Sequence, residues 1–128
     1  MFEWGMGNGE WGMRSPELET RTKQFALRII KMFGRLPKRT DADVFGRQVL
    51  RSGTSVAANY LEASRARSKA ELISKLAIVE QELAETKLWL ELLVESEIVA
   101  AEKMDDLHRE TEELLKITVA SIKTLKGK

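Results

Sequence analysis

The sequence predicts an all-α protein, an up-down-up-down antiparallel four-helix bundle. Its 128 residues include only two prolines and eight glycines, and the composition is dominated by the helix formers Leu, Ala, Glu, Lys and Arg. Apolar residues recur at spacings of three and four in four successive segments, which is the period of a helix with one buried face. The connections between these segments are short, as is typical of antiparallel neighbours in a bundle.

Residues 1–14, MFEWGMGNGEWGMR, precede the first predicted helix and follow neither a helical nor a strand period. They hold four of the eight glycines and repeat Glu-Trp-Gly-Met at 3–6 and 10–13. We expect a flexible Gly/Trp-rich arm. Two interpretations stay open: an arm without a further role, and a partner-docking arm anchored by Trp4 and Trp11, since Trp is common among binding hot spots.

The bundle domain is predicted to span residues 15–126. Ser15 is placed as the N-cap of its first helix, with Pro16 at the first helical position. This helix is predicted to close at Leu36, because a residue before proline is pushed out of the α region. Its apolar seam consists of Leu18, Thr22, Phe25, Ile29, Met32 and Leu36.

The second helix is predicted to run from Thr40 or Asp41, either of which can cap it, to about Ala66. Its seam consists of Phe45, Val49, Ser52, Val56 and Asn59. Gly46 and Gly53 lie on one side of it, although a glycine inside a helix costs up to about 1 kcal/mol relative to alanine. Close approach of a neighbouring helix and a plain kink are equally consistent with this pair.

A capping box, Ser68-Lys69-Ala70-Glu71, predicts the start of the third helix. Its seam is the most regular in the chain: Leu72, Leu76, Val79, Leu83, Thr86, Leu90 and Leu93. The fourth helix follows a short turn at 96–99. Its predicted inward residues are Met104, His108, Thr111, Leu115, Thr118, Ile122 and Leu125.

The second helix carries more apolar surface than one bundle core needs, because Leu50, Ala58 and Leu61 extend its apolar character beyond the seam. The narrow polar stripe left on it is formed by Gln48, Arg51, Ser55, Asn59 and Glu62. Because an unpaired buried polar group costs roughly 1–3 kcal/mol, we interpret this polar ladder as buried and mutually hydrogen bonded. Ile78, Trp89 and Leu92 lie outside the seam of the third helix. We therefore expect a homo-oligomer whose subunits or helices the polar ladder holds in register; the alternative is a solvent-facing stripe on a monomer.

Residues 48–63 read Gln-Val-Leu-Arg-Ser-Gly-Thr-Ser-Val-Ala-Ala-Asn-Tyr-Leu-Glu-Ala. This segment resembles the signature of the four-helix-bundle family of 23S ribosomal RNA intervening-sequence proteins, Gln-Leu-x-Arg-Ala-x-x-Ser-Ile-x-x-Asn-Ile-x-Glu-Gly. The five residues of the polar ladder match the polar letters of that motif. The similarity extends from about Leu18 to Leu125. Ala63 departs from the usual glycine, and Glu82 stands where a serine is common.

The resemblance implies a homopentameric ring of bundles, encoded either inside a ribosomal RNA gene or as a free-standing gene. A related branch is similar as well: the accessory variability determinant of diversity-generating retroelements, a basic pentameric barrel that binds a reverse transcriptase and its template RNA. The motif favours the first branch more directly, and both stay open.

The net charge of +1 conceals an asymmetry along the chain. Residues 17–40 carry seven bases and two acids, a net of +5, whereas 71–128 carry eight bases and thirteen acids, a net of −5. A polyanion-binding face and pairing between neighbouring subunits are both consistent with such a division. The candidate phosphate-contacting residues on the first helix and the segment after it are Arg21, Arg28, Lys31, Arg35, Lys38, Arg39 and Arg47.

We accordingly expect a non-enzymatic oligomeric accessory protein that binds RNA or DNA through these cations, with avidity raised by repetition around a ring. The alternative is a protein-interaction scaffold, for example one that binds a reverse transcriptase. Since no aromatic residues are interleaved with the basic stripe, sequence-specific reading of bases is not expected.

Several classes are excluded by the composition. The chain has no cysteine and one histidine, His108, so a thiolate nucleophile, a zinc ribbon and a histidine-based dyad are not expected. No Gly-rich phosphate loop or triad is present. We expect no catalysis, no metal and no cofactor. With no apolar run of about 18 residues and no secretory signal, we expect a cytoplasmic protein without a membrane partner.

Overall fold

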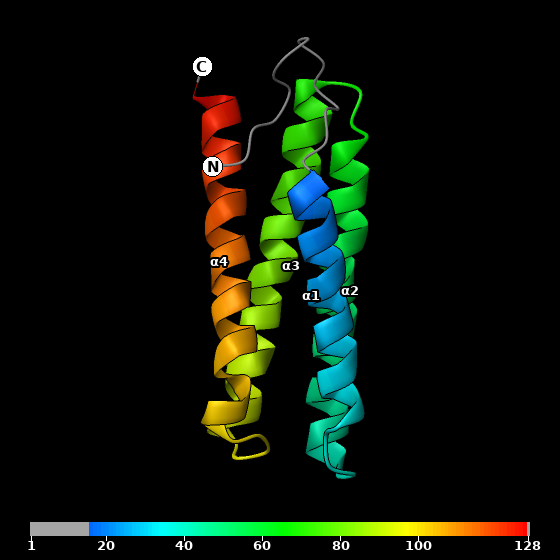
Figure 1. The fold of residues 1–128 in the computed structure, drawn as a ribbon, viewed down its shortest axis with the longest axis vertical. Helices are drawn as coiled ribbons and strands as arrows, with labels where there is room; N and C mark the ends of the chain where they lie inside the picture. Colours follow the sequence, from blue (N-terminus) through cyan, green and yellow to red (C-terminus); the bar gives the residue numbers. More distant parts are fainter. Residues whose placement is uncertain (1–15, 128) are drawn as a thin grey trace.

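The computed structural model describes residues 16–127 of the chain. They form four helices: α1 (Pro16–Gly34), α2 (Thr40–Ser64), α3 (Lys69–Glu95) and α4 (Ala101–Lys126). The helices run alternately up and down (Figure 1), and the described range holds no strand. The predicted all-α antiparallel four-helix bundle is therefore confirmed. The arm at 1–14, with Trp4 and Trp11, and the predicted N-cap Ser15 lie outside the described residues.

One apolar cluster fills the bundle, with contributions from all four helices. All seven predicted seam residues of α3 are buried. On α1, Phe25 and Ile29 are fully buried, and on α2 so are Val49 and Val56. Asn59, which was predicted on the α2 seam, is only half-buried. The core thus follows the predicted period closely on α3 and more loosely elsewhere.

The predicted inward face of α4 is wrong at two positions. His108 and Leu115 are half-buried, and the residues preceding them, Leu107 and Leu114, take the core positions. Both choices alternate spacings of three and four and share Thr111, so the period alone does not separate them. The structure turns α4 so that the imidazole of His108 meets a carboxylate of α3 instead of the core.

Three helix ends also differ from the prediction. The N-cap of α2 is Arg39, which makes no capping hydrogen bond, and Thr40 begins the helix. Asp41 stands in the first turn, where its carboxylate accepts two hydrogen bonds from Arg39, each of 2.8 Å. At the other end α2 stops at Ser64 instead of about Ala66. Helix α1 ends at Gly34, two residues before the predicted boundary.

Helix α3 begins as the capping box predicts and ends in a Schellman motif. Ser68 Oγ accepts a hydrogen bond from the Glu71 amide at 3.1 Å. At the far end, the amide of Glu97 donates to Val94 O, at 2.9 Å, and the amide of Ile98 donates to Leu93 O, at 3.0 Å. Glu97 has a φ of 64°, the left-handed conformation that this motif requires.

The two glycines of α2 face α1 at close range. A Cβ at Gly53 would lie 2.8 Å from Ile29 Cγ1, and a Cβ at Gly46 would lie 2.6 Å from Leu36 Cδ1. These distances are shorter than real Cβ contacts. Close approach, one of the two interpretations left open by the sequence, is therefore observed at both positions.

The bundle is unevenly packed around its circumference. Helices α2 and α3 form the most extensive pair, α1 packs on α2, and α4 packs on α3, whereas α1 and α4 meet at only a few points. Figure 1 shows α4 at one side of the molecule and α1 and α2 at the other, with α3 between them. Consequently the side of the bundle between α1 and α4 is open.

Candidate nucleic-acid interface

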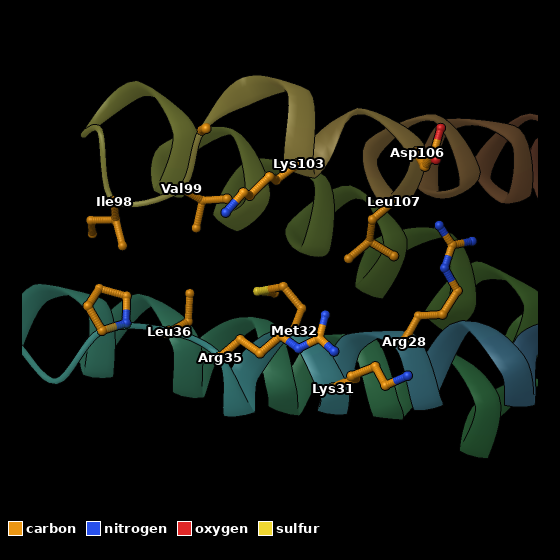
Figure 2. A pocket seen from close by; sticks show the side chains of 12 residues that line it. Arg28, Lys31, Met32, Arg35, Leu36, Ile98, Val99, Lys103, Asp106 and Leu107 are labelled. Atoms are coloured by element: carbon orange, nitrogen blue, oxygen red, sulfur yellow. The ribbon is translucent and has the colours of Figure 1, made fainter.

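The open side holds a groove between the C-terminal half of α1 and the N-terminal end of α4, with a volume of about 660 Å³. Its apolar lining comes from both walls: Met32, Leu36, Pro37, Ile98, Val99 and Leu107. Figure 2 shows Met32 and Leu36 on one wall facing Val99 and Leu107 on the other. Residues of the turns after α1 and α3 line one end of the groove, so it lies at the end of the bundle that holds both turns.

Four cations line the same groove: Arg28, Lys31, Arg35 and Lys103. The first three belong to the predicted basic stripe: Arg28 and Lys31 lie on α1, and Arg35 directly follows its last residue. Lys103 comes from the first turn of α4 and was missed by the sequence analysis. In an antiparallel bundle the start of α4 must lie beside the end of α1, so topology combined with charge was the signal that could have found it.

The structure divides the seven predicted phosphate-contacting residues into two groups. Arg28, Lys31, Arg35 and Lys38 are exposed and have no carboxylate partner among the described residues. Arg21, Arg39 and Arg47 are each paired with an acid. An unpaired guanidinium or ammonium group can approach a phosphate without first giving up a partner, so the first group is the better placed for this role.

Among these three arginines, Arg21 forms an ion pair between two helices, with two hydrogen bonds. Its Nε and Nη2 atoms donate to the Glu110 carboxylate on α4 at 2.7 and 2.9 Å. These hydrogen bonds raise the pKa of the Arg21 guanidinium, against an opposing effect of burial. Because the pair spans the open side of the bundle, Arg21 ties α1 to α4.

The other two pairs are local. The hydrogen bonds from Arg39 lower the pKa of the Asp41 carboxyl, and the same contact raises the pKa of Arg39. Arg47 Nε lies 3.1 Å from Asp43 Oδ2, four residues earlier on α2. Both arginines remain exposed, and pairs of this kind are weak enough for a phosphate to compete with them.

The polar ladder of α2 reaches mainly toward α3. Arg51 Nη2 donates to Glu85 Oε1 at 2.8 Å, and Glu62 Oε1 accepts from Lys75 Nζ at 2.7 Å. The hydrogen bond from Lys75 to Glu62 raises the pKa of that lysine. Within the ladder, Asn59 Nδ2 donates to the carbonyl of Ser55 at 2.9 Å. The side chains were predicted to satisfy one another, but the charged ones pair with α3 because opposite charges lie there.

The ladder is also less buried than predicted. Gln48, Ser55 and Asn59 are half-buried and Arg51 and Glu62 are exposed in the single chain. Its placement on the flank of α2 beside α3 explains this difference.

Apolar surface remains exposed on α1 and α2. Leu27 and Ile30 of α1 and Leu61 of α2 are 51%, 46% and 39% exposed. On the side of α3, Trp89 stacks on Phe45 with ring centroids 6.1 Å apart. Next to this stack, Trp89 Nε1 and Glu82 Oε1 are buried without a hydrogen-bond partner in the described chain. Arg51 Nη1 lies 3.5 Å from that oxygen, close enough for an ion pair.

The surplus apolar residues predicted from the sequence are divided between the core and the surface. Leu50, Ile78 and Leu92 are half-buried, whereas Ala58 and Leu61 are exposed. Leu27 and Ile30 of α1 were missed, since they stand apart from the apolar seam of that helix.

His108 makes a polar contact between α3 and α4. Its Nε2 atom lies 2.8 Å from Glu91 Oε2, and its Nδ1 atom lies 3.8 Å from Glu112 Oε1. Among the described residues, no group of three or more His, Cys, Asp or Glu side chains is arranged to hold a metal ion. None of the helices in residues 16–127 is both long and apolar enough to cross a bilayer.

The structure thus defines a class: a four-helix-bundle protein with a cation-lined groove on its open side. The sequence profile of the family described as 23S rRNA-intervening sequence protein matches residues 17–120, and the chain belongs to that family. No curated protein matches the chain.

Among solved structures, the chain is similar to a crystal structure of a protein with unknown function from the S23 ribosomal protein family, from Bacteroides thetaiotaomicron. The two are 36% identical with a TM-score of 0.78, and the alignment covers 83% of this chain and 98% of the other. The predicted family resemblance is therefore confirmed.

Proposed function

We propose that this protein is a non-enzymatic, homo-oligomeric accessory factor that binds RNA or DNA through the cations at one end of its bundle. The observation that carries the proposal is the cluster of five exposed cations, unpaired within the described chain, that α1, the following turn and α4 present together. We call this set the cation cluster: Arg28, Lys31, Arg35, Lys38 and Lys103.

Phosphate contacts of this kind give affinity that depends on salt and little on sequence. The described residues that line the groove include no aromatic side chain on which bases could stack. The protein therefore binds the phosphate backbone of the nucleic acid and does not distinguish its bases.

The exposed apolar surfaces support assembly into a closed ring, with five subunits as the proposed number. A ring uses a heterologous interface, in which two different surfaces of one subunit meet two different neighbours. Two candidates are the exposed apolar residues of α1 and α2, Leu27, Ile30 and Leu61, and the surface around Trp89 and Glu82 of α3. A ring would repeat the cation cluster and raise the avidity for a polyanion.

Nucleic-acid binding is tested by fluorescence anisotropy with single- and double-stranded RNA and DNA at roughly 50 and 200 mM salt. The expected dissociation constant rises steeply with salt, by about 0.7 to 0.9 logarithmic units per decade for each phosphate contact. The triple variant Arg28→Gln, Lys31→Gln, Arg35→Gln should bind weakly. Its matched control removes three exposed lysines of α4, by Lys116→Gln, Lys123→Gln and Lys126→Gln.

Absence of binding at the lower salt concentration would overturn the proposal and favour the protein-interaction scaffold, for which a reverse transcriptase is one candidate partner. Equal weakening in the triple variant and in its control would show attraction by overall charge alone, and the assignment to the cation cluster would fail.

Assembly is tested by light scattering. A mass of 14.5 kDa at micromolar concentration would contradict the oligomer. The variant Ile30→Arg, Leu61→Arg should dissociate it, whereas Val119→Arg, at an exposed apolar position of α4, should leave the mass unchanged.

A further inference from the structure

The groove between α1 and α4 combines an apolar floor with a charged rim. Its floor is apolar, with Leu107 only 6% exposed. Toward the turns its rim carries Lys31, Arg35 and Lys103, and the other end carries Arg28 and Asp106 (Figure 2). A phosphate backbone would contact the rim cations and leave the apolar floor exposed to solvent. A ligand that fits the whole groove therefore has apolar or aromatic groups and also carries negative charge.

The chain contains a segment with this chemistry outside the described residues. The N-terminal repeat Glu-Trp-Gly-Met, at 3–6 and 10–13, places an acid directly before a Trp and a Met two residues after that Trp. Trp and Met supply large apolar contacts, and the acid can pair with an exposed cation of the rim. The repeat therefore complements the groove in both polarity and charge.

The charges along the N-terminal arm are also in an order that complements the charges along the open side of the bundle. Beyond the groove, toward the start of α1, a smaller hollow is lined by Arg28, Arg109 and three acids that include Glu113. Counted back from the start of α1, the arm presents Arg14 first and then Glu10 and Glu3. Two of these acids are paired, Glu110 with Arg21 and Asp106 with Arg109. An arm folded back along the open side would bring Arg14 near the remaining acid, Glu113, and Glu10 and Glu3 toward the cation cluster.

The length of the arm is sufficient. Met32, on the floor of the groove, is 16 residues after Pro16, or roughly 24 Å along α1 at 1.5 Å per residue. Trp4 is 12 residues before Pro16, and an extended chain of that length spans at most about 40 Å. Trp11, five residues before Pro16, reaches roughly 17 Å, close to the level of Arg28.

From these features we propose that the groove between α1 and α4 is the docking site of the chain's own N-terminal Glu-Trp-Gly-Met repeat. The docked arm folds back over the Arg21–Glu110 pair. Its Trp side chains cover the apolar floor, and Glu3 and Glu10 face the cationic rim. The proposal does not depend on nucleic-acid binding.

The absence of cysteine from the sequence allows a direct test in the full chain by disulfide formation. Gly7 lies between the two repeats, so Gly7→Cys leaves both intact. Paired with Lys103→Cys on the rim, it should form an intramolecular disulfide. The matched control pairs Gly7→Cys with Lys116→Cys: Lys116 is exposed and closer along the bundle to the start of α1, but it lies on another face of α4.

The expected result is a disulfide that forms at least about ten times faster with position 103 than with position 116, since docking raises the effective concentration of the two thiols. Adding Trp4→Ala and Trp11→Ala should remove this preference. Equal rates for the two pairs, a preference that survives loss of both Trp residues, or a product that links two chains would each overturn the proposal.

Discussion

Glu97 holds a backbone conformation that favours glycine. It occupies the position after the C-cap of α3, where the Schellman hydrogen bonds require a positive φ, and its φ is 64°. The left-handed conformation costs an L-residue roughly 1–2 kcal/mol, part of which glycine recovers.

Glu97→Gly is therefore expected to raise the free energy of unfolding by about 0.5–1 kcal/mol, measured by urea denaturation. Glu95→Gly, in the last turn of α3 itself, is the control and should lower it by up to about 1 kcal/mol. If Glu97→Gly instead lowers the free energy of unfolding, the Glu97 side chain stabilises the fold by more than its left-handed backbone costs.

A second residue-scale feature is a pair of buried hydroxyls that joins α2 to α3. Ser52 Oγ and Thr86 Oγ1 are 2.8 Å apart, and both residues are fully buried. Thr86 also donates to the carbonyl of Glu82 at 2.8 Å. Since a hydroxyl carries one hydrogen, Ser52 must then be the donor to Thr86.

Thr86→Val keeps the shape of the side chain but removes the acceptor of Ser52, whose remaining contact is Val49 O at 3.5 Å. We expect a loss of about 1–3 kcal/mol in the free energy of unfolding. The double variant Ser52→Ala, Thr86→Val should lose less than the two single variants combined, because it leaves no orphaned hydroxyl. Additivity within about 0.5 kcal/mol in a double-mutant cycle would contradict this coupling.

At the scale of elements, the contact of α1 with α2 depends on two glycines that differ in what surrounds them. A Cβ at Gly53 would meet Ile29, a fully buried and β-branched residue, at 2.8 Å to Cγ1 and 3.2 Å to Cβ. A Cβ at Gly46 would meet the far end of Leu36 and the ring of Phe33, both only half-buried. Ile29 has little room to move, whereas Leu36 can rotate away.

Gly53→Ala should therefore lower the free energy of unfolding by about 1–3 kcal/mol through overpacking. Gly46→Ala should leave it unchanged or raise it by up to about 1 kcal/mol, because alanine favours the helix. Thermal and urea denaturation of the two variants provide the comparison, and each serves as the control for the other. Equal effects would show that the distance between α1 and α2 is not fixed at Gly53.

These elements also show what local sequence determines. Helix α3 contacts α2 on one side and α4 on the other, so its seam is broad and regular and was predicted without error. Helix α4 contacts mainly α3, and two phases of the same period fit its sequence. The structure places Leu107 in the core and His108 against Glu91 of α3, a long-range partner that the periodicity of α4 does not reveal.

At the scale of the whole molecule, the basic first half and the acidic second half of the chain are joined by only some of their possible ion pairs. The pair of Arg47 with Asp43 could be anticipated, because the two are four residues apart on one helix. The pair of Arg21 with Glu110 could not, because it depends on how α1 and α4 face each other. After this pairing, the cation cluster remains without carboxylate partners in the described chain, and Lys103 belongs to it.

If the N-terminal repeat occupies the groove and nucleic acid uses the same rim, the two must compete. Trp4→Ala, Trp11→Ala should then tighten binding to single-stranded RNA at roughly 50 mM salt, because the observed affinity scales with the fraction of molecules whose site is open. An arm docked nine-tenths of the time would give about a tenfold gain. Asn8→Ala, between the repeats, is the control and should leave the affinity unchanged. Unchanged affinity in the Trp variant, alongside the expected disulfide with position 103, would place the nucleic acid on Lys38 and the outer cations and leave the floor of the groove to the arm alone.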